Sequence, residues 1–236
     1  MKLYYILAFG TLLCSQLCSS ASAAMASEEP YNSGIVLRWK DCKQRIDGFG
    51  IAQAGWAKEL FAFKNREQVM DKMFGKDGLR LNILRGEIFP HYWENETDKD
   101  FNLNDDIHIE LSDSDFINKS DDLLRRGQLW LTLKAKNKYH ISKLVFSTWS
   151  APAWMKSNGK VSNGRLKTEC YTDFANYLAA FYNAYKSKGI APYAISPSNE
   201  PGYAAPWNSS LWTADEMGKF ITSYLGPCLL YTSDAA

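Results

Sequence analysis

Short apolar segments alternate with longer amphipathic segments four times along this chain, and this alternation most limits the possible folds. The predicted strands cover residues 46–51, 79–88, 144–150 and 192–197, and the predicted helices cover residues 56–74, 123–139, 171–188 and 214–224. A strand followed by a helix, repeated in this way, requires neighbouring strands to run parallel, which gives an α/β fold. Between the second strand and the second helix, the acidic residues 98–122 are expected to form a long surface loop.

The helix limits rest on local signals. The helix over residues 56–74 has an apolar stripe and is expected to end at the glycines that follow it. Thr213 is expected to cap the last helix, and Gly189 to close the third. The stripe consists of Trp56, Leu60, Phe63, Val69, Met70 and Met73.

Two α/β architectures fit this order of elements. An open, doubly wound sheet that binds nucleotides would carry a glycine-rich phosphate loop, but neither GxGxxG nor GxxxxGK[ST] follows a predicted strand. Aromatic, carboxylate and amide residues follow the strands instead, which is typical of (β/α)8 barrels, whose chemistry lies at the C-terminal strand ends. We therefore predict the first half of a (β/α)8 TIM barrel.

Composition excludes some partners. The chain has 27 Lys and Arg against 26 Asp and Glu, so its charge gives no case for binding nucleic acid. Aromatic residues make up 14%, which fits either a large aromatic core or a carbohydrate cleft. The three histidines, His91, His108 and His140, lack metal-ligand spacing, so we expect no metal or other cofactor. No stable protein partner is predicted.

The N-terminus has the form of a signal peptide, residues 1–23. Lys2 precedes an apolar run over residues 3–13 that is too short to span a bilayer, and Ala21-Ser22-Ala23 is a cleavage site. We expect cleavage after Ala23 and export. A lipid anchor on Cys18 is the alternative, although the residues before it match a lipobox poorly.

Export would permit disulfides. Cys42 and Cys170 could pair, or they could be two unrelated buried thiols.

The candidate catalytic group is Glu200, which follows a predicted strand directly. It lies between Asn199 and Pro201, with Pro197 just upstream, and the prolines stiffen the loop. A stiff strand end can aim a carboxylate at a substrate. A solvated loop glutamate is the ordinary alternative.

Two further strand ends carry candidates. Trp149 and Trp154 flank a proline-containing turn, where they could form a platform for a sugar or belong to the core. Arg85 and Glu87 share one face of the second strand, and an inward arginine needs a carboxylate partner. A structural Arg85–Glu87 pair is therefore expected, with Glu87 as a catalytic carboxylate as the alternative.

Together these segments resemble glycoside hydrolase family 30 over about residues 36–227. The chain departs from that family at Ala151, where a second proline is usual, and at Ser198, where glutamine is usual. The segments that carry the resemblance are Ile46-Asp47-Gly48-Phe49-Gly50, Ile83-Leu84-Arg85, Trp149-Ser150-Ala151-Pro152-Ala153-Trp154-Met155-Lys156 and Ile195-Ser196-Pro197-Ser198-Asn199-Glu200-Pro201.

The resemblance implies an architecture and a mechanism. A barrel over residues 46–227 would carry a β-sandwich partly built from strands within residues 34–45. A retaining mechanism would use two carboxylates, with Glu200 as general acid and base and the nucleophile on a later strand that this chain lacks. Asn199 would bind the sugar 2-hydroxyl, and Arg85 would keep the nucleophile ionised. Trp149 and Trp154 would shape the sugar site.

The function that follows is retaining hydrolysis of an O-glycoside, in a polysaccharide or glycolipid substrate. Xylan, β-1,6-linked galactan or glucan, and glucosylceramide remain open, and a non-catalytic carbohydrate-binding protein is the alternative. Residues 228–236 read like a translated sequencing adapter, so we expect the natural reading frame to continue past Pro227 and the chain alone to be inactive.

Overall fold

The computed structural model describes residues 40, 43–53, 56–93, 97 and 123–234. The chain divides into two compact units, Met1–Ile46 and Asp47–Ala236, and every helix and strand named below lies in the second. The expected signal peptide, Cys42 and the loop expected over residues 98–122 fall outside the described residues. So do most of the sandwich strands expected over residues 34–45, and the described residues 40 and 43–45 are not in strands.

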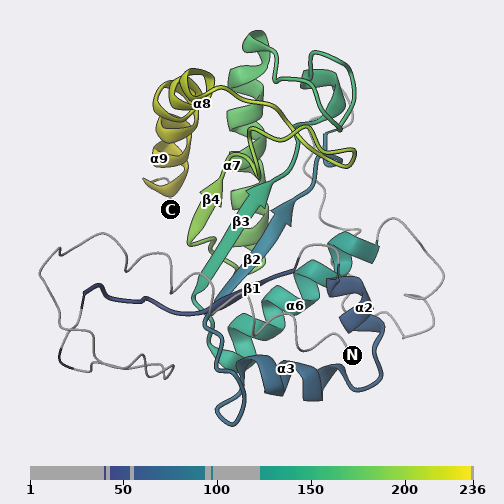
Figure 1. Cartoon of the computed structure of the whole chain (residues 1–236), viewed down its shortest axis with the longest axis vertical. Helices are drawn as coiled ribbons and strands as arrows, with labels where there is room; N and C mark the ends of the chain where they lie inside the picture. Colours follow the sequence, from purple (N-terminus) through teal and green to yellow (C-terminus); the bar gives the residue numbers. More distant parts are fainter. Residues whose placement is uncertain (1–39, 41–42, 54–55, 94–96, 98–122, 235–236) are drawn as a thin grey trace, which may run out of the picture. The chain divides into compact units, whose positions relative to one another are not determined.

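The centre of the second unit is a four-stranded sheet in the order β1-β2-β3-β4. The strands are β1 (Gly50–Ala52), β2 (Ile83–Ile88), β3 (Lys143–Thr148) and β4 (Ala194–Ser196), and each pairs with the next in parallel (Figure 1). The strand order follows the chain order without reversal, as in a barrel wall and unlike a doubly wound sheet. The predicted half of a (β/α)8 barrel is confirmed.

All four strands are shorter than predicted, and the first two begin four residues late. The segment expected from residue 46 becomes β1 only at Gly50, and the segment expected from residue 79 becomes β2 only at Ile83. Leu79 is 72% exposed and Arg80 has a positive φ of 53°, which no strand accommodates. These residues therefore form the turn that leads into β2.

The helix expected over residues 56–74 is two helices, α2 (Ala57–Ala62) and α3 (Arg66–Phe74). Phe63 is 49% exposed, so its place in the apolar stripe was wrong. The break is held by Arg66, whose guanidinium donates to the carbonyl oxygen of Phe61 at 2.6 Å. Arg66 also lies 4.8 Å from the Phe61 ring centroid, so it satisfies the end of α2 both electrostatically and by packing.

The next two helices match their predictions. Helix α6 covers Leu123–Tyr139, and α7 covers Tyr171–Ser187 with Gly189 at a φ of +77° just beyond its end. One face of α7 packs on the sheet, where Phe181 and Tyr185 each lie 5.0 Å from the ring of Phe146 on β3. This aromatic layer forms the centre of the core.

The loop between β3 and α7 contains two short 3₁₀ turns, η1 (Ala153–Met155) and η2 (Thr168–Cys170). After β4, Thr213 caps α8 (Ala214–Phe220) as predicted, with its hydroxyl oxygen accepting from the backbone N–H of Glu216 at 3.2 Å. The helical chain then continues through a π-helical turn, η3 (Ile221–Leu225), into α9 (Gly226–Asp234). Pro227 fits because it lies in the first turn of α9.

Candidate active site

The two faces of β2 have different roles. Its side chains alternate in burial, and Leu84 and Ile88 are buried in the core. Arg85 and Glu87 lie on the opposite face, as their parity predicts. Glu87 pairs in register with Ser147, and Ser147 with Ser196, so polar residues of three strands share that face near the carboxyl ends.

Arg85 connects β2 to the loop that follows β4. Its guanidinium donates to Oδ1 of Asn199 at 2.7 Å, and its carbon Cζ lies 4.6 Å from the ring centroid of Trp149. Asn199 in turn donates from Nδ2 to a carboxylate oxygen of Glu200 at 3.2 Å. The structure thus brings together four of the five predicted site residues, from three strand ends.

The backbone fixes this arrangement. The backbone N–H of Asn199 donates to the carbonyl of Thr148, the last residue of β3, at 2.8 Å. Glu200 has a positive φ of 46°, which is rare for a residue with a side chain. Such strained residues occur often at functional sites, because the surrounding structure must hold them there. The exposed carboxylate of Glu200 is therefore held at a strand end in a defined orientation.

Electrostatics tie the two carboxylates to Arg85. Burial lowers the pKa of Arg85, while the negative charges of Glu87 and Glu200 oppose that shift. Burial raises the pKa of Glu87 to about 7, although a hydrogen bond from Asn208 and the charge of Arg85 act in the other direction. The face therefore holds one cation between two carboxyl groups.

The expected structural pair of Arg85 and Glu87 is not found. Within the described residues no ion pair joins the two side chains, and Arg85 instead meets an amide oxygen and an indole ring. The side chain of Asn208 lies beside the Glu87 carboxyl group and favours its charged form. Sequence reasoning missed Asn208, which has no motif signal and comes close only because its loop folds back.

The two predicted tryptophans lie in different surroundings. Trp149 lies beneath Arg85. Trp154 packs against the core, and its indole N–H donates to the carbonyl of Trp93 at 3.3 Å. No described contact links Trp154 to Arg85, Asn199 or Glu200, so the structure does not bring it into the same group.

A buried lysine holds the loops around the site. Lys156 is 1% exposed and donates from Nζ to the carbonyl of Ser209 at 2.7 Å and to Oγ of Ser150 at 3.0 Å. Burial lowers its pKa to about 8. The bonds join the loop after β3 to the loop after β4, which carries Asn208. The sequence offered one signal, the position of Lys156 at the end of the Trp149–Lys156 motif.

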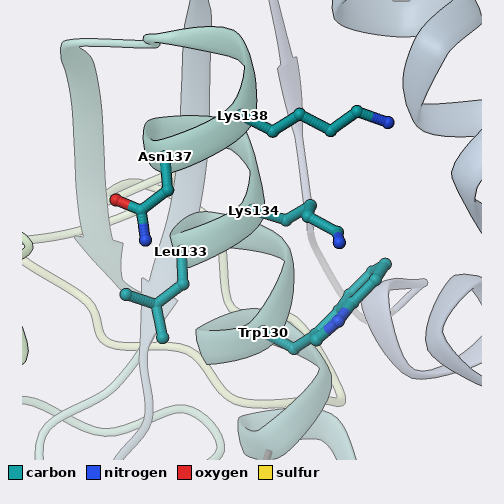
Figure 2. Close-up of a pocket in the computed structure, with 5 residues that line it drawn as sticks. All are labelled: Trp130, Leu133, Lys134, Asn137 and Lys138. Atoms are coloured by element: carbon teal, nitrogen blue, oxygen red, sulfur yellow. The ribbon is translucent and has the colours of Figure 1, made fainter.

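A separate hollow lies on α6. It is lined by Trp130, Leu133, Lys134, Asn137 and Lys138, all from that helix, as Figure 2 shows. These residues differ from the strand-end group, and two of them, Lys134 and Lys138, form ion pairs with Glu67 of α3. The hollow therefore does not belong to the candidate active site.

Within the part of the chain that the structure describes, no group of three or more His, Cys, Asp or Glu residues could hold a metal ion. No helix there is long and apolar enough to cross a membrane.

The consecutive parallel strands, with charged and amide side chains at their carboxyl ends, define an α/β protein of the TIM-barrel class. The chain belongs to glycosyl hydrolase family 30: residues 46–236 match the TIM-barrel domain of that family.

Three similar proteins show the range of the family. Lysosomal acid glucosylceramidase of Mus musculus is 28% identical over 224 residues, which are 85% of this chain and 41% of the mouse protein. Glucuronoxylanase XynC of Bacillus subtilis is 27% identical over 221 residues, 91% of this chain and 43% of that enzyme. The crystal structure of SrfJ from Salmonella typhimurium superposes with a TM-score of 0.63 at 27% identity, covering 80% of this chain and 42% of SrfJ.

The chain therefore spans about two fifths of the length of the relatives it matches. The named relatives are a glucosylceramidase and a glucuronoxylanase, so the family points to hydrolysis of β-linked glycans or glucosylceramide.

Proposed function

We propose that this chain is the part of a retaining β-glycosidase that carries the general acid and base, Glu200. The observation that supports it most is the connected group of Arg85, Asn199 and Glu200 at the ends of β2 and β4. A retaining glycosidase needs a carboxyl group that first protonates the leaving oxygen and then deprotonates water. An exposed glutamate that the backbone holds in a strained conformation is suited to that task.

Asn199 and Arg85 have supporting roles in this proposal. Asn199 accepts from Arg85 through Oδ1, which turns its Nδ2 toward Glu200 and toward a bound sugar hydroxyl. Arg85 supplies the positive charge that keeps a nearby nucleophilic carboxylate ionised. Trp149, held beneath Arg85, forms one wall of the sugar site.

The mechanism also needs a second carboxylate about 5–5.5 Å from the first. A nucleophile must be ionised, and the raised pKa of Glu87 makes that group unsuited to the role. We propose that the nucleophile lies in sequence that this chain does not include, consistent with its spanning 41% of the mouse relative.

A substrate panel tests the proposal. The protein should be expressed as its genomic locus encodes it, with any sequence that follows residue 236, and incubated with glucosylceramide, glucuronoxylan and β-1,6-glucan. We expect hydrolysis of at least one substrate, and a loss of about 10²- to 10⁴-fold in Glu200→Gln on that substrate. Hydrolysis of the natural glycan by Glu200→Gln at the wild-type rate would exclude the assignment.

We further propose that the protein is exported after cleavage near Ala23, because residues 1–23 have the three parts of a signal peptide. N-terminal mass spectrometry of the secreted protein should find a mature chain that starts near Ala24. An intact N-terminus from Met1 would exclude cleavage, and a lipid on Cys18 would favour the anchored alternative.

A further inference from the structure

Glu87 lies in the candidate site, but the two-carboxylate mechanism leaves it without a role. It shares the polar face of β2 with Arg85, and its charge, like that of Glu200, acts on Arg85. Its register partner Ser147 is fully buried on the same face. Glu87 thus lies on the same face of the sheet as Arg85, which contacts Asn199.

The backbone of Glu87 is held by an unusual contact from α6. The Gln128 side chain accepts from the backbone N–H of Glu87 at 2.6 Å and donates to its carbonyl at 2.7 Å. Strand β1 pairs with β2 only as far as Arg85, so at Glu87 the amide of Gln128 takes the place of the missing strand. Gln128 is itself buried and also donates to the hydroxyl of Tyr185 at 3.1 Å.

The neighbouring glycine makes this contact possible. A Cβ atom at Gly86 would lie 2.6 Å from the ring of Phe146 and 2.9 Å from Oε1 of Gln128. Only glycine at this position lets the amide reach the strand. Gly86, Gln128 and Tyr185 together fix the position of Glu87 from the core side.

Among the described residues, no ion pair is formed by the carboxyl group of Glu87. Arg85 directs its hydrogen bond to Asn199, and the side chain beside the Glu87 carboxyl group is the neutral amide of Asn208. A carboxyl group that remains partly buried without an ion pair carries a desolvation cost, which a ligand hydroxyl can offset by hydrogen bonding.

We propose that Glu87 is a substrate-binding residue, whose carboxyl group hydrogen-bonds uncharged sugar hydroxyls, and that Gln128 is its positioning residue. The proposal rests on the proposed glycosidase function and deepens it. It identifies the ligand by its chemistry: a neutral sugar unit that presents hydroxyl groups toward the end of β2. The groups beside Glu87 are Arg85 of its own strand, Ser147 of β3, and Asn208 of the loop after β4. The charge of Glu200 acts on the same arginine.

The test uses the protein as its locus encodes it, with the substrate that it hydrolyses best in the panel above. Glu87→Ala should raise KM by about 10- to 100-fold, since a hydrogen bond to a carboxyl group has this weight in binding, with a smaller change in kcat. Glu87→Gln keeps the shape and should lose less. The matched control is Glu169→Ala on the exposed turn η2, which should retain the wild-type KM.

A pH profile distinguishes a role of Glu87 in substrate binding from a purely structural role. In the wild type, kcat/KM should show a step near pH 7, where free-enzyme Glu87 titrates, and Glu87→Gln should lack that step. Gln128→Leu, which removes the two hydrogen bonds to the backbone of Glu87, should raise KM in the same direction while circular dichroism shows a folded protein.

The outcomes are distinguishable. If the wild type hydrolyses a panel substrate but Glu87→Ala and Glu87→Gln both keep its KM and pH profile, the role of Glu87 is refuted and the proposed function stands. If the wild type hydrolyses no substrate, the proposed function fails and this inference fails with it.

Discussion

Two polar groups at the carboxyl end of the sheet satisfy their charges in different ways. At the candidate site, Arg85 is partly buried, stacks on Trp149 and has Glu87 and Glu200 nearby. In the loops around the site, Lys156 is buried, and among the described residues its side chain bonds to two neutral oxygen atoms, those of Ser150 and Ser209. The first group includes an exposed carboxylate, that of Glu200, whereas the second is enclosed and joins the loop after β3 to the loop after β4.

The segment from Trp149 to Lys156 contains both a residue of the candidate site and residues that support the fold. Within the segment from Trp149 to Lys156, Trp149 contacts Arg85, whereas Met155 and Lys156 are buried. Trp154 packs against the core. A sequence motif therefore cannot assign a catalytic role to each of its members, and the contacts of each side chain decide it.

Among variants that distinguish the candidate site from the loops held by Lys156, Arg85→Leu should have the largest effect on turnover. Removal of this cation leaves Asn199 without its donor and removes the charge beside both carboxyl groups. Turnover of the full-length protein should fall by about 10²-fold or more, which corresponds to two hydrogen-bonded or charged contacts. Steady-state kinetics measure this change.

The matched control is Arg165→Leu, which removes an exposed ion pair with Glu216. Because exposed pairs contribute little, activity and stability should both stay close to wild type. Equal losses in the two variants would contradict the special role of Arg85.

Lys156→Met should show the opposite pattern, a loss of stability with catalysis retained per folded molecule. The variant leaves the carbonyl of Ser209 without its donor, which should lower the free energy of unfolding by about 1–3 kcal/mol. Chemical denaturation measures the change, with Lys160→Met on the exposed surface as the control.

The pH dependence of the free energy of unfolding gives a second test of the role of Lys156. The pKa of Lys156 is about 8 in the folded protein against an ordinary 10.5, so the unfolded state binds more protons between these values. Wild-type stability should therefore rise with pH across this window, relative to Lys156→Met. A difference that stays constant with pH would show that Lys156 is not buried as described.

Glu87 should give the wild-type stability the opposite pH dependence, which Glu87→Gln should remove. Burial raises the pKa of Glu87 from 4.5 to about 7, so the folded state binds more protons between these values. Wild-type stability should fall as pH rises through this range, by on the order of 1–3 kcal/mol, and the variant should lack that fall. Thermal unfolding at pH 5 and pH 7 compares the two proteins directly.

Much of the fold could be predicted because periodicity and helix caps are local signals. Helix α6 has the predicted limits, and the capping of α8 by Thr213 depends on residues three positions apart. The break between α2 and α3 could not be predicted, because the cation that caps it, Arg66, also needs the ring of Trp130 from a distant helix.

The candidate site could also be predicted only in part from the sequence. The motif around Glu200 and the parity of Arg85 and Glu87 are visible in sequence, but the contact between Arg85 and Asn199 spans 114 positions. Gln128 and Asn208 belong to no motif, and only the folded chain brings them to Glu87. Position along a strand can be predicted from sequence, whereas partners supplied by distant loops cannot.

The central claim is that Glu200 acts as the general acid and base, and azide rescue of Glu200→Gln tests it most directly. The full-length variant should be assayed on an aryl β-glycoside with a good leaving group, which needs little protonation in the first step. We predict slow turnover that azide increases, with a β-glycosyl azide as product, because the anion replaces the water that Glu200 would activate. Turnover that azide does not change, or a variant as active as the wild type without it, would contradict the account.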